Sequence, residues 1–278
     1  MFIDPNWRIM VVGDGDFSFS AALAKNYQPR QLLATIYDSQ EQLTDKYGDG
    51  FYRQLTSLAL HHPVAVMTQF DVTQEQAWQA LAKDCNQFDV IIFQFPLVPG
   101  YTSKAEFEGN GRIDSNLRNR RLLHQFLKNA LKYGLDPQGA GLIYISSKDV
   151  KPYSEWDIEH SLHLTTELTC IGKVPFAFTD FPGYQMRNVD RDKFVKDTAS
   201  YTYIWRSVHN TQTLPAAIEQ ALTPPQPRES SQNRCNLCQA GPFHSQQEQN
   251  EHLASKRHQK LQGYQQRWLD DLGLTDPP

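Results

Sequence analysis

The chain has 278 residues, 40% of them hydrophobic and 21% charged, with a formal net charge of −4 and a pI near 6.1. These totals predict a soluble globular protein with one large domain and a small module, and they exclude nucleic-acid binding over the whole surface, so any RNA site must be local. No apolar run reaches the roughly 20 residues of a membrane span, MFIDPNWR has no signal-peptide pattern, and the four cysteines form no disulfide framework, so we expect an intracellular protein without a membrane partner.

The first predicted strand begins at Ile9 and ends in a glycine loop that leads into a small-residue helix reaching about Leu23. Gly13 and Gly15 can adopt backbone angles closed to other residues and let a ligand lie against the main chain. The third glycine of the dinucleotide fingerprint is missing, and Asp14 and Asp16 disfavour a phosphate. We therefore expect a cofactor that is positively charged and lacks phosphate, for which S-adenosylmethionine is the common example. An ordinary glycine-rich turn is the alternative.

The run GDGDFSFSAALA at 13–24 carries a family resemblance. It resembles the opening motif G-[DE]-G-[DN]-F-S-F-S of the Rossmann-like methyltransferases that modify N3 of a uridine in large-subunit ribosomal RNA. The resemblance implies a class I methyltransferase fold, bound S-adenosylmethionine and an RNA substrate. The cofactor-binding residues that it implies in this loop are Gly13, Asp14, Gly15, Phe17 and Ser18.

Two acidic residues follow the next predicted strands. Asp38 ends the strand at 32–39, where an acid in a nucleoside-binding sheet accepts hydrogen bonds from the ribose hydroxyls, and the family has the same T-x-Y-D-S pattern. Asp71 follows the strand at 63–67, where it would receive the adenine amino group. A strand-end turn residue is the alternative for Asp38, and an N-cap of the helix starting near Gln74 is the alternative for Asp71. Residues 41–60 predict two short helices around a turn.

FDVIIFQFPLVPG at 88–100 is the strongest strand pattern and belongs at the centre of the sheet. Ligands bind beyond the carboxyl ends of such strands, so Gln94 and Pro96 should project into the active site, with Gln94 close to both cofactor and target base. The family reads F-N-F-P-H-V-G-G here. This chain has Gln94 for the asparagine, Leu97 for the histidine and Pro99 for a glycine.

The next segments complete the predicted sheet. A charged stretch at 101–113 predicts a lid, and basic residues between 104 and 132 are a candidate RNA contact or a solvated helix face. RNRRLL at 118–123, KPYSEWDI at 151–158 and FPGYQMR at 181–187 resemble family segments, while 168–178 and 201–208 predict an antiparallel strand pair. Asp149, at the end of the strand at 139–149, is the candidate general base, with a cap or salt-bridge partner as its alternative. Tyr153 and Trp156 are expected to pack at a helix start, with base stacking as the alternative.

Beyond a proline-containing segment at 223–233, which predicts an extended linker, two cysteines and two histidines have zinc-ligand spacing. Zinc prefers four ligands in a tetrahedron, so a turn would supply Cys235 and Cys238, and one helix face His252 and His258. The ending HLASKRHQK resembles the matrin and double-stranded-RNA-binding class of two-Cys two-His fingers. The basic side chains of this segment suggest a tethered arm that binds RNA or a partner.

The predicted fold is α/β: a Rossmann-like class I methyltransferase domain at 1–222 with a mostly parallel seven-stranded sheet, a linker at 223–233, a ββα-type zinc finger at 234–268 and a tail at 269–278. The predicted function is S-adenosylmethionine-dependent methylation of N3 of a uridine in ribosomal RNA, with ribosomal RNA or a pre-ribosomal particle as partner. The alternative is a non-catalytic RNA-binding protein that keeps the fold. Cytoplasm, or nucleolus in a eukaryote, is the expected location.

Overall fold

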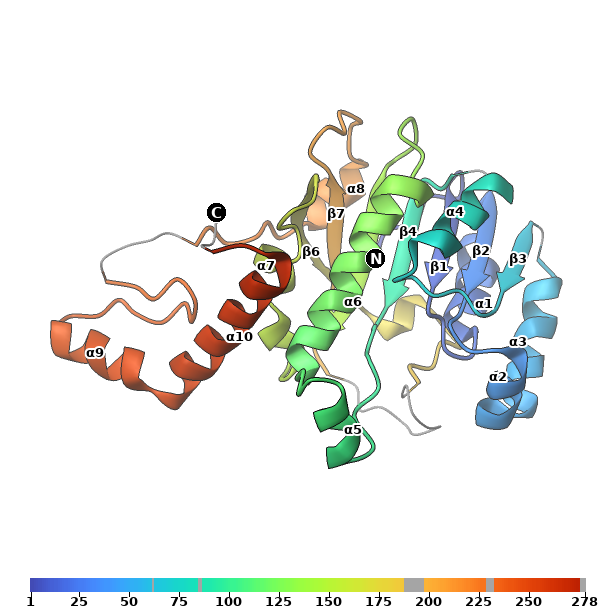
Figure 1. The fold of residues 1–278 in the computed structure, drawn as a ribbon. Helices are drawn as coiled ribbons and strands as arrows, with labels where there is room; N and C mark the ends of the chain where they lie inside the picture. The colour runs from blue at the N-terminus through green and yellow to red at the C-terminus, as the bar shows by residue number, and fades with distance from the viewer. Residues whose placement is uncertain (62, 85–86, 188–197, 229–232, 276–278) are drawn as a thin grey trace.

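A computed structural model describes residues 1–278 except 62, 85–86, 188–197, 229–232 and 276–278 (Figure 1). Its centre is a seven-stranded sheet in the order β3-β2-β1-β4-β5-β7-β6. The strands are β1 (Arg8–Val12), β2 (Gln31–Thr35), β3 (Val64–Met67), β4 (Val90–Gln94), β5 (Leu142–Lys148), β6 (Leu168–Pro175) and β7 (Ser200–Ser207). The pairs are parallel from β3 to β5, and β7 runs antiparallel to both β5 and β6. The predicted fold class is confirmed.

Helices lie on both faces of this sheet (Figure 1). The α-helices are α1 (Ser18–Tyr27), α2 (Gln40–Tyr47), α3 (Asp49–Ala59), α4 (Glu75–Asp84), α5 (Lys104–Gly109), α6 (Ser115–Asn129), α7 (Ile158–Ser161), α8 (Ala216–Ala221), α9 (Gln246–Ala254) and α10 (Lys256–Leu272). Shorter turns are the π-helical η1 (Ala130–Gly134) and the 3-10 helices η2 (Tyr153–Trp156) and η3 (Phe178–Asp180). None of the described helices is long and apolar enough to cross a membrane.

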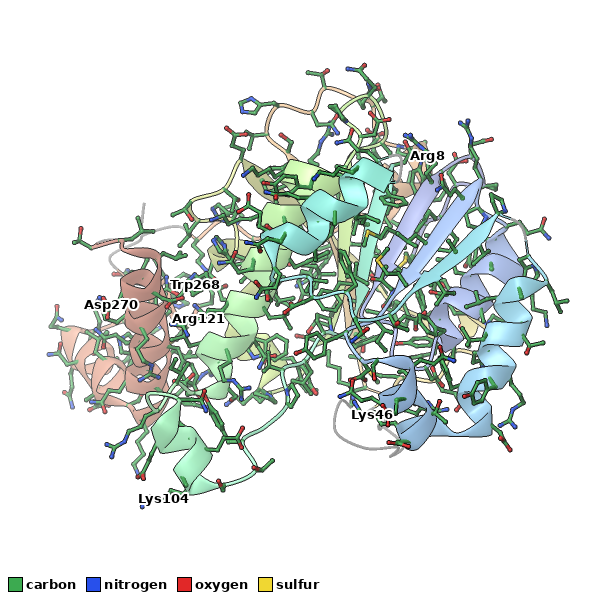
Figure 2. All side chains as sticks on the ribbon, turned by 45° about the vertical axis from the view of Figure 1, so that its right-hand side comes forward. Arg8, Lys46, Lys104, Arg121, Trp268 and Asp270 are labelled. Carbon is green, nitrogen blue, oxygen red and sulfur yellow. The ribbon has the colours of Figure 1, made fainter. Side chains whose placement is uncertain are left out.

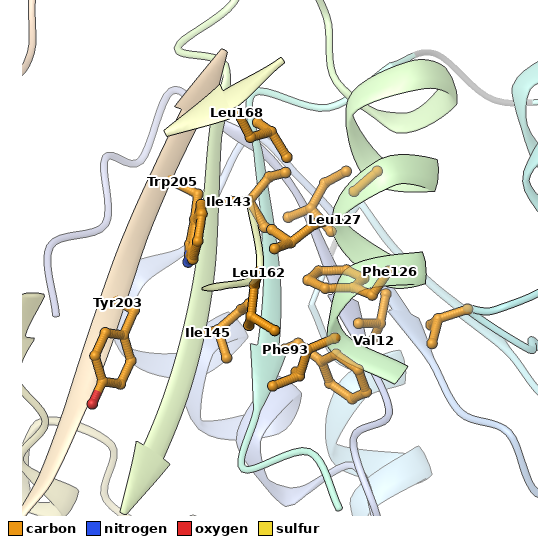
Figure 3. Close-up of a cluster of buried hydrophobic side chains, with 14 of the residues drawn as sticks. Val12, Phe93, Phe126, Leu127, Ile143, Ile145, Leu162, Leu168, Tyr203 and Trp205 are labelled. Atoms are coloured by element: carbon orange, nitrogen blue, oxygen red, sulfur yellow. The ribbon is translucent and has the colours of Figure 1, made fainter. Parts of the chain in front are cut away.

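The sheet is apolar on both faces because side chains alternate along each strand and both faces are covered. Every residue of β4 is buried. Phe93 points to the face that carries α6, where Phe126 and Leu127 pack onto it (Figure 3). Ile92 points to the opposite face, in the cluster that includes α1. The carboxyl ends of the central strands are thereby fixed at one edge of a rigid layer.

The C-terminal arm, residues 234–275, packs against this body through α10. Trp268 is fully buried in the same core cluster as Leu123 of α6, and its Nε1 donates a 3.0 Å hydrogen bond to the Ser161 carbonyl. Figure 2 shows Trp268 beside Arg121 at the boundary between α10 and α6. The prediction of an independently tethered arm is therefore wrong, because an apolar stripe on α10 is covered by the body. The predicted boundary at residue 268 falls inside α10.

The segment expected to be an extended, solvated linker also contacts the body. Thr223 forms a β-bridge with Lys173 of β6, and Arg228 makes an ion pair with Asp157. Residues 229–232 of this segment lie outside the described part of the chain. The described part of this segment thus touches the body at Thr223 and at Arg228.

Candidate active site and metal centre

A cavity of about 940 Å³ lies beyond the carboxyl ends of β1, β2 and β4. This is where the strand order reverses, between β1 and β4, which is the usual ligand position in an open parallel sheet. The volume is near the upper end of the range for small-molecule sites, about 300–1,000 Å³. The structure brings seven of the predicted site residues together in its lining: Gly13, Asp14, Gly15, Asp38, Asp71, Gln94 and Pro96.

Two motif residues predicted to contact the cofactor lie behind the loop, outside the cavity lining. Phe17 has a left-handed backbone with φ of 64° and is buried beside Phe51, with 6.0 Å between ring centroids. The hydroxyl of Ser18 accepts a 3.1 Å hydrogen bond from the backbone of Gln185. These two predictions are corrected, because both side chains hold the loop in shape from within the protein.

The strand-end residue Asp149 is also corrected. It is exposed and lies outside the lining, whereas the preceding residue, Lys148, is buried and lines the cavity. Successive side chains of a strand point to opposite sides, so a shift of one residue decides whether a side chain at the end of β5 reaches the cavity. Asp149 is therefore not placed to act as a base on a substrate in this cavity.

The backbone conformation and close packing at position 13 require a glycine. Its φ is +64°, and a Cβ built there would lie 2.5 Å from the Phe93 ring. The backbone thus approaches the end of β4 more closely than any side chain at this position would allow. This contact places the glycine loop directly beside the Gln94 segment.

The two acids of the loop are buried in different ways. Asp14 accepts a 2.7 Å hydrogen bond from the Ser20 amide. Burial raises the pKa of Asp14 to about 7, although the hydrogen bonds from Ser20 and Phe19 lower it. Asp16 forms a 2.8 Å ion pair with Arg187 Nε. The FPGYQMR segment therefore neutralises one loop carboxylate, while the carboxylate of Asp14 accepts hydrogen bonds from amides in the first turn of α1 and has no cation paired with it among the described residues.

The acids after β2 and β3 lie on the same side of the cavity. Asp38 pairs with Lys46 at 2.8 Å and keeps a partly exposed carboxylate in the lining. Asp71 accepts hydrogen bonds of 2.9 and 2.7 Å from the amide and hydroxyl of Thr73, closing a turn just before α4 begins at Glu75. Asp71 thus closes a turn with Thr73 before α4 and does not take the N-cap position predicted as its alternative, and the residue lines the cavity.

Gln94 supplies a buried polar group without a partner. The residue is 5% exposed, and its Oε1 has no hydrogen-bond partner among the described residues, while Nε2 lies 3.9 Å from Met1 Sδ. A buried acceptor left unpaired costs roughly 1–3 kcal/mol, which a ligand donor would recover. The neighbouring segment is held in place by a 2.9 Å hydrogen bond from the Val98 amide to Asn119.

Several lining residues were missed or only partly identified from the sequence. Arg118 and Arg121 of α6 belong to the basic stretch that the sequence predicted as a candidate RNA contact, and both line the cavity. Tyr153, for which packing was favoured over base stacking, also lines the cavity, whereas Trp156 is buried. Asp271, from α10, also lines it. Asp271 carries no local signal, because its place in the site depends on how α10 docks.

A candidate metal centre lies in the C-terminal arm, apart from the cavity. The ligand atoms of Cys235, Cys238, His252 and His258 lie within 4.8 Å of one another. His258 Nδ1 is 3.4 Å from Cys235 Sγ and 3.5 Å from Cys238 Sγ. Tetrahedral zinc with ordinary bond lengths would place sulfur and nitrogen ligands about 3.6 Å apart, so the donor set fits. The buried His252 Nε2 has no partner among the described residues, as expected of a ligand atom.

The local structure of the arm differs from the predicted ββα finger. The cysteines lie on a turn closed by a bridge between Cys235 and Ala240, but the histidines come from two helices. Ser255 ends α9 and caps α10 by accepting a hydrogen bond from the His258 amide. The wide spacing between the histidines is accommodated by this break and not by a single helix face.

Comparison with protein families finds one match that covers most of the chain. Residues 10–188 match the family described as BMT5-like, rRNA (uridine-N3-)-methyltransferase BTM5-like. The matched range includes the glycine loop, Asp38, Asp71 and Gln94, and it ends before the C-terminal arm.

Two curated relatives illustrate the range of similarity. Heavy metal-associated isoprenylated plant protein 41 of Arabidopsis thaliana is 29% identical over 192 residues, covering 66% of this chain and 33% of the plant protein. The chain thus spans about a third of that relative's length. The 25S rRNA (uridine(2634)-N(3))-methyltransferase of Saccharomyces cerevisiae is 26% identical over 229 residues, covering 66% of this chain and 67% of the yeast protein.

Two solved structures illustrate the structural similarity, which is distant. TrmN from Thermus thermophilus aligns with a TM-score of 0.42 and 13% identity, over 74% of this chain and 45% of that chain. A ribosomal protein L11 methylase from Lactobacillus delbrueckii subsp. bulgaricus aligns with a TM-score of 0.38 and 14% identity, over 73% and 71%. The fold assignment rests on the strand order described above.

Proposed function

The chain belongs to the BMT5-like rRNA (uridine-N3-)-methyltransferase family, and on that premise we propose that it methylates N3 of a uridine in ribosomal RNA, with S-adenosylmethionine as methyl donor. The observation that carries the proposal is the cavity itself: an acidic glycine loop meets a buried amide with an unpartnered oxygen at the strand-order switch. The substrate would be met in the cytoplasm or, in a eukaryote, the nucleolus.

The chemistry of the lining suits this cofactor. The Asp38 carboxylate is the group that would accept hydrogen bonds from ribose hydroxyls, and Asp71 the one that would receive the adenine amino group. Asp14 favours a positive charge nearby, because its burial penalises an isolated carboxylate. Residues 13–17 of the loop carry no positively charged side chain for a pyrophosphate, and Asp14 adds a carboxylate. A sulfonium compound without phosphate is the better match.

When bound, S-adenosylmethionine supplies an electrophilic methyl group. The protein's part is mainly to position the target nitrogen in line with it and to exclude water. Gln94 is placed for this, because its amide offers an acceptor and a donor to the edge of a base. Its Nε2 can donate a hydrogen bond to a carbonyl oxygen of uracil and so hold N3 next to the glycine loop. The N3 proton has to leave as the methyl group arrives, and because an amide is not a base, that proton would pass to water.

The test is transfer of labelled methyl groups from S-adenosylmethionine to RNA, followed by nucleoside analysis. We expect 3-methyluridine as product and a strong loss of turnover in Gln94→Ala with cofactor affinity within a few fold of wild type. The exposed Arg53→Ala on α3 serves as control. Absence of cofactor binding by calorimetry, together with retained RNA binding, would instead favour the non-catalytic RNA-binding alternative.

The metal of the C-terminal arm is proposed to be zinc, because two thiolates and two imidazoles at these separations match its tetrahedral preference. We expect one zinc per chain in the purified protein. Cys238→Ser should lose it, whereas Cys170→Ala, at a buried cysteine of β6, should keep it. Stoichiometric zinc in the Cys238 variant would contradict the ligand assignment.

A further inference from the structure

Charged side chains line both ends of the cavity. At one end, the loops after β1, β2 and β3 supply Asp14, Asp16, Asp38 and Asp71, and two of these acids are paired with lining cations, Asp16 with Arg187 and Asp38 with Lys46. Its cations at the other end come from α6 and the end of β5 and comprise Arg118, Arg121 and Lys148. The sheet order separates these two groups, because β4 and β5 lie on the far side of β1 from β2 and β3. At the second end two arginines lie one helical turn apart on α6, an arrangement that can bind a phosphodiester through both guanidinium groups.

Arg118 is fixed at the mouth of this second end. Its Nη1 donates a 2.8 Å hydrogen bond to the Pro99 carbonyl, and its guanidinium stacks over Tyr101 with 4.2 Å to the ring centroid. Both contacts come from the segment that follows Gln94. The cation is therefore held close to the position proposed for the target base, and it retains donors for a ligand.

Arg121, one helical turn further along α6, is oriented by a residue from the C-terminal arm. Its Nε lies 2.9 Å from each carboxylate oxygen of Asp271, and its Nη2 also bonds that carboxylate. Among the described residues, nothing accepts a hydrogen bond from Nη1. The guanidinium is thus fixed along one edge and keeps its other edge available, an arrangement that suits an oxyanion.

The position of Asp271 depends on the docked helix α10. Trp268 anchors that helix in the core, Arg267 pairs with Asp114 at 2.7 Å, and Lys260 pairs with Glu155 at 2.8 Å. These contacts use two of the basic side chains that the sequence suggested for RNA binding. At its beginning, α10 carries the candidate metal ligand His258. The arm therefore ends at the cavity as part of its wall.

We propose that Arg118 and Arg121 bind a phosphate of the RNA strand beside the target nucleotide, and that Asp271 positions Arg121 for this contact. The proposal rests on the proposed function, since it takes RNA as the ligand. It assigns the arm a role in building the substrate site. Asp271 is a positioning residue, because it acts through the guanidinium and not on the RNA.

The experiment measures binding of a fluorescein-labelled oligouridine to the full-length protein by anisotropy over a salt series, with cofactor affinity measured in parallel. Arg121→Ala should weaken RNA binding by about tenfold and reduce the salt dependence by about one counterion. Arg121→Lys should keep the salt dependence but bind more weakly than wild type, because it loses the planar fork. The matched control Arg53→Ala should change neither quantity appreciably.

Asp271→Asn tests the positioning role, because it removes the carboxylate charge while keeping the size of the side chain. We expect a several-fold weaker RNA affinity with unchanged cofactor affinity, and no additional loss when the change is combined with Arg121→Ala. Tighter RNA binding by Asp271→Asn would overturn the proposal, since it would mean that Asp271 competes with RNA for Arg121. Unchanged binding by a folded Arg121→Ala variant would also overturn it.

Failure of this inference is distinguishable from failure of the proposed function. Oligouridine binding is measured without methyl transfer, so a wild-type protein that binds oligouridine but neither binds S-adenosylmethionine nor methylates RNA contradicts the function alone. Melting temperatures of all variants establish that they are folded. If Arg121→Ala is unstable, the RNA affinity and salt dependence of Arg121→Lys are compared with those of the wild type instead.

Discussion

Asp14→Asn is expected to stabilise the protein in a way that depends on pH. Burial raises the pKa of Asp14 from its ordinary value of 3.8 to about 7. The folded state therefore holds the proton more tightly than the unfolded state, and the carboxyl group lowers stability progressively as the pH rises through this interval. Above the folded-state pKa the cost is complete, at about 4 kcal/mol.

Asparagine resembles the protonated carboxyl group and keeps an oxygen to accept the 2.7 Å hydrogen bond from the Ser20 amide. Its own buried amide hydrogens bring a cost, but this cost does not vary with pH. The difference in unfolding free energy between Asp14→Asn and wild type should thus increase by about 3 kcal/mol from about pH 5 to about pH 8. Urea denaturation at the two pH values measures it.

Asp45→Asn, an exposed position on α2, is the control, and its stability should stay within about 0.5 kcal/mol of wild type at both pH values. At about pH 8, Asp14→Asn should also weaken binding of the cationic cofactor, so stability and affinity would change in opposite directions. A stability difference that does not vary with pH would refute the reasoning, because it would mean that the carboxyl group is hydrated in the folded protein.

Three further substitutions test the site and the arm. Gly13→Val should weaken S-adenosylmethionine binding at least tenfold in calorimetry, because its φ is +64° and a Cβ would lie 2.5 Å from Phe93; unchanged affinity would remove the glycine loop from the cofactor site. Asp38→Ala should cause a similar loss, roughly 1.4 kcal/mol, through the ribose hydroxyls, and a cofactor that binds it as tightly as wild type would contradict that role. Trp268→Ala should lower the free energy of unfolding by about 3–5 kcal/mol in urea, and a loss confined to a separate transition of the arm would support an independent tether instead.

Much of the fold could be predicted from local patterns. The continuous apolar run of β4 indicated a strand covered on both faces, and its burial confirms this. Asp38 and Asp71 were located because parallel strands end at a common edge, where the structure brings both into one cavity. Such inferences need only the pattern of apolar residues along the chain and the positions at which the strands end.

Side-chain direction within the loops was less accessible to the sequence. Phe17 belongs to the motif that indicated the cofactor, yet its left-handed backbone directs the ring into the core beside Phe51. Asp149 and Lys148 are adjacent, and only Lys148 lines the cavity. A motif marks where a loop approaches a ligand, but the φ and ψ angles of each residue decide which side chains reach it.

The docking of the C-terminal arm was decided by tertiary structure alone. The cysteine and histidine spacing suffices to predict a candidate metal site, because all four possible ligands lie within one short segment. Asp271 reaches Arg121 across 150 residues of sequence, and the burial of Trp268 sets that contact. An amphipathic helix shows in its sequence that one face will be covered, but the covering surface is selected by shape and charge complementarity between elements that meet only after the chain has folded.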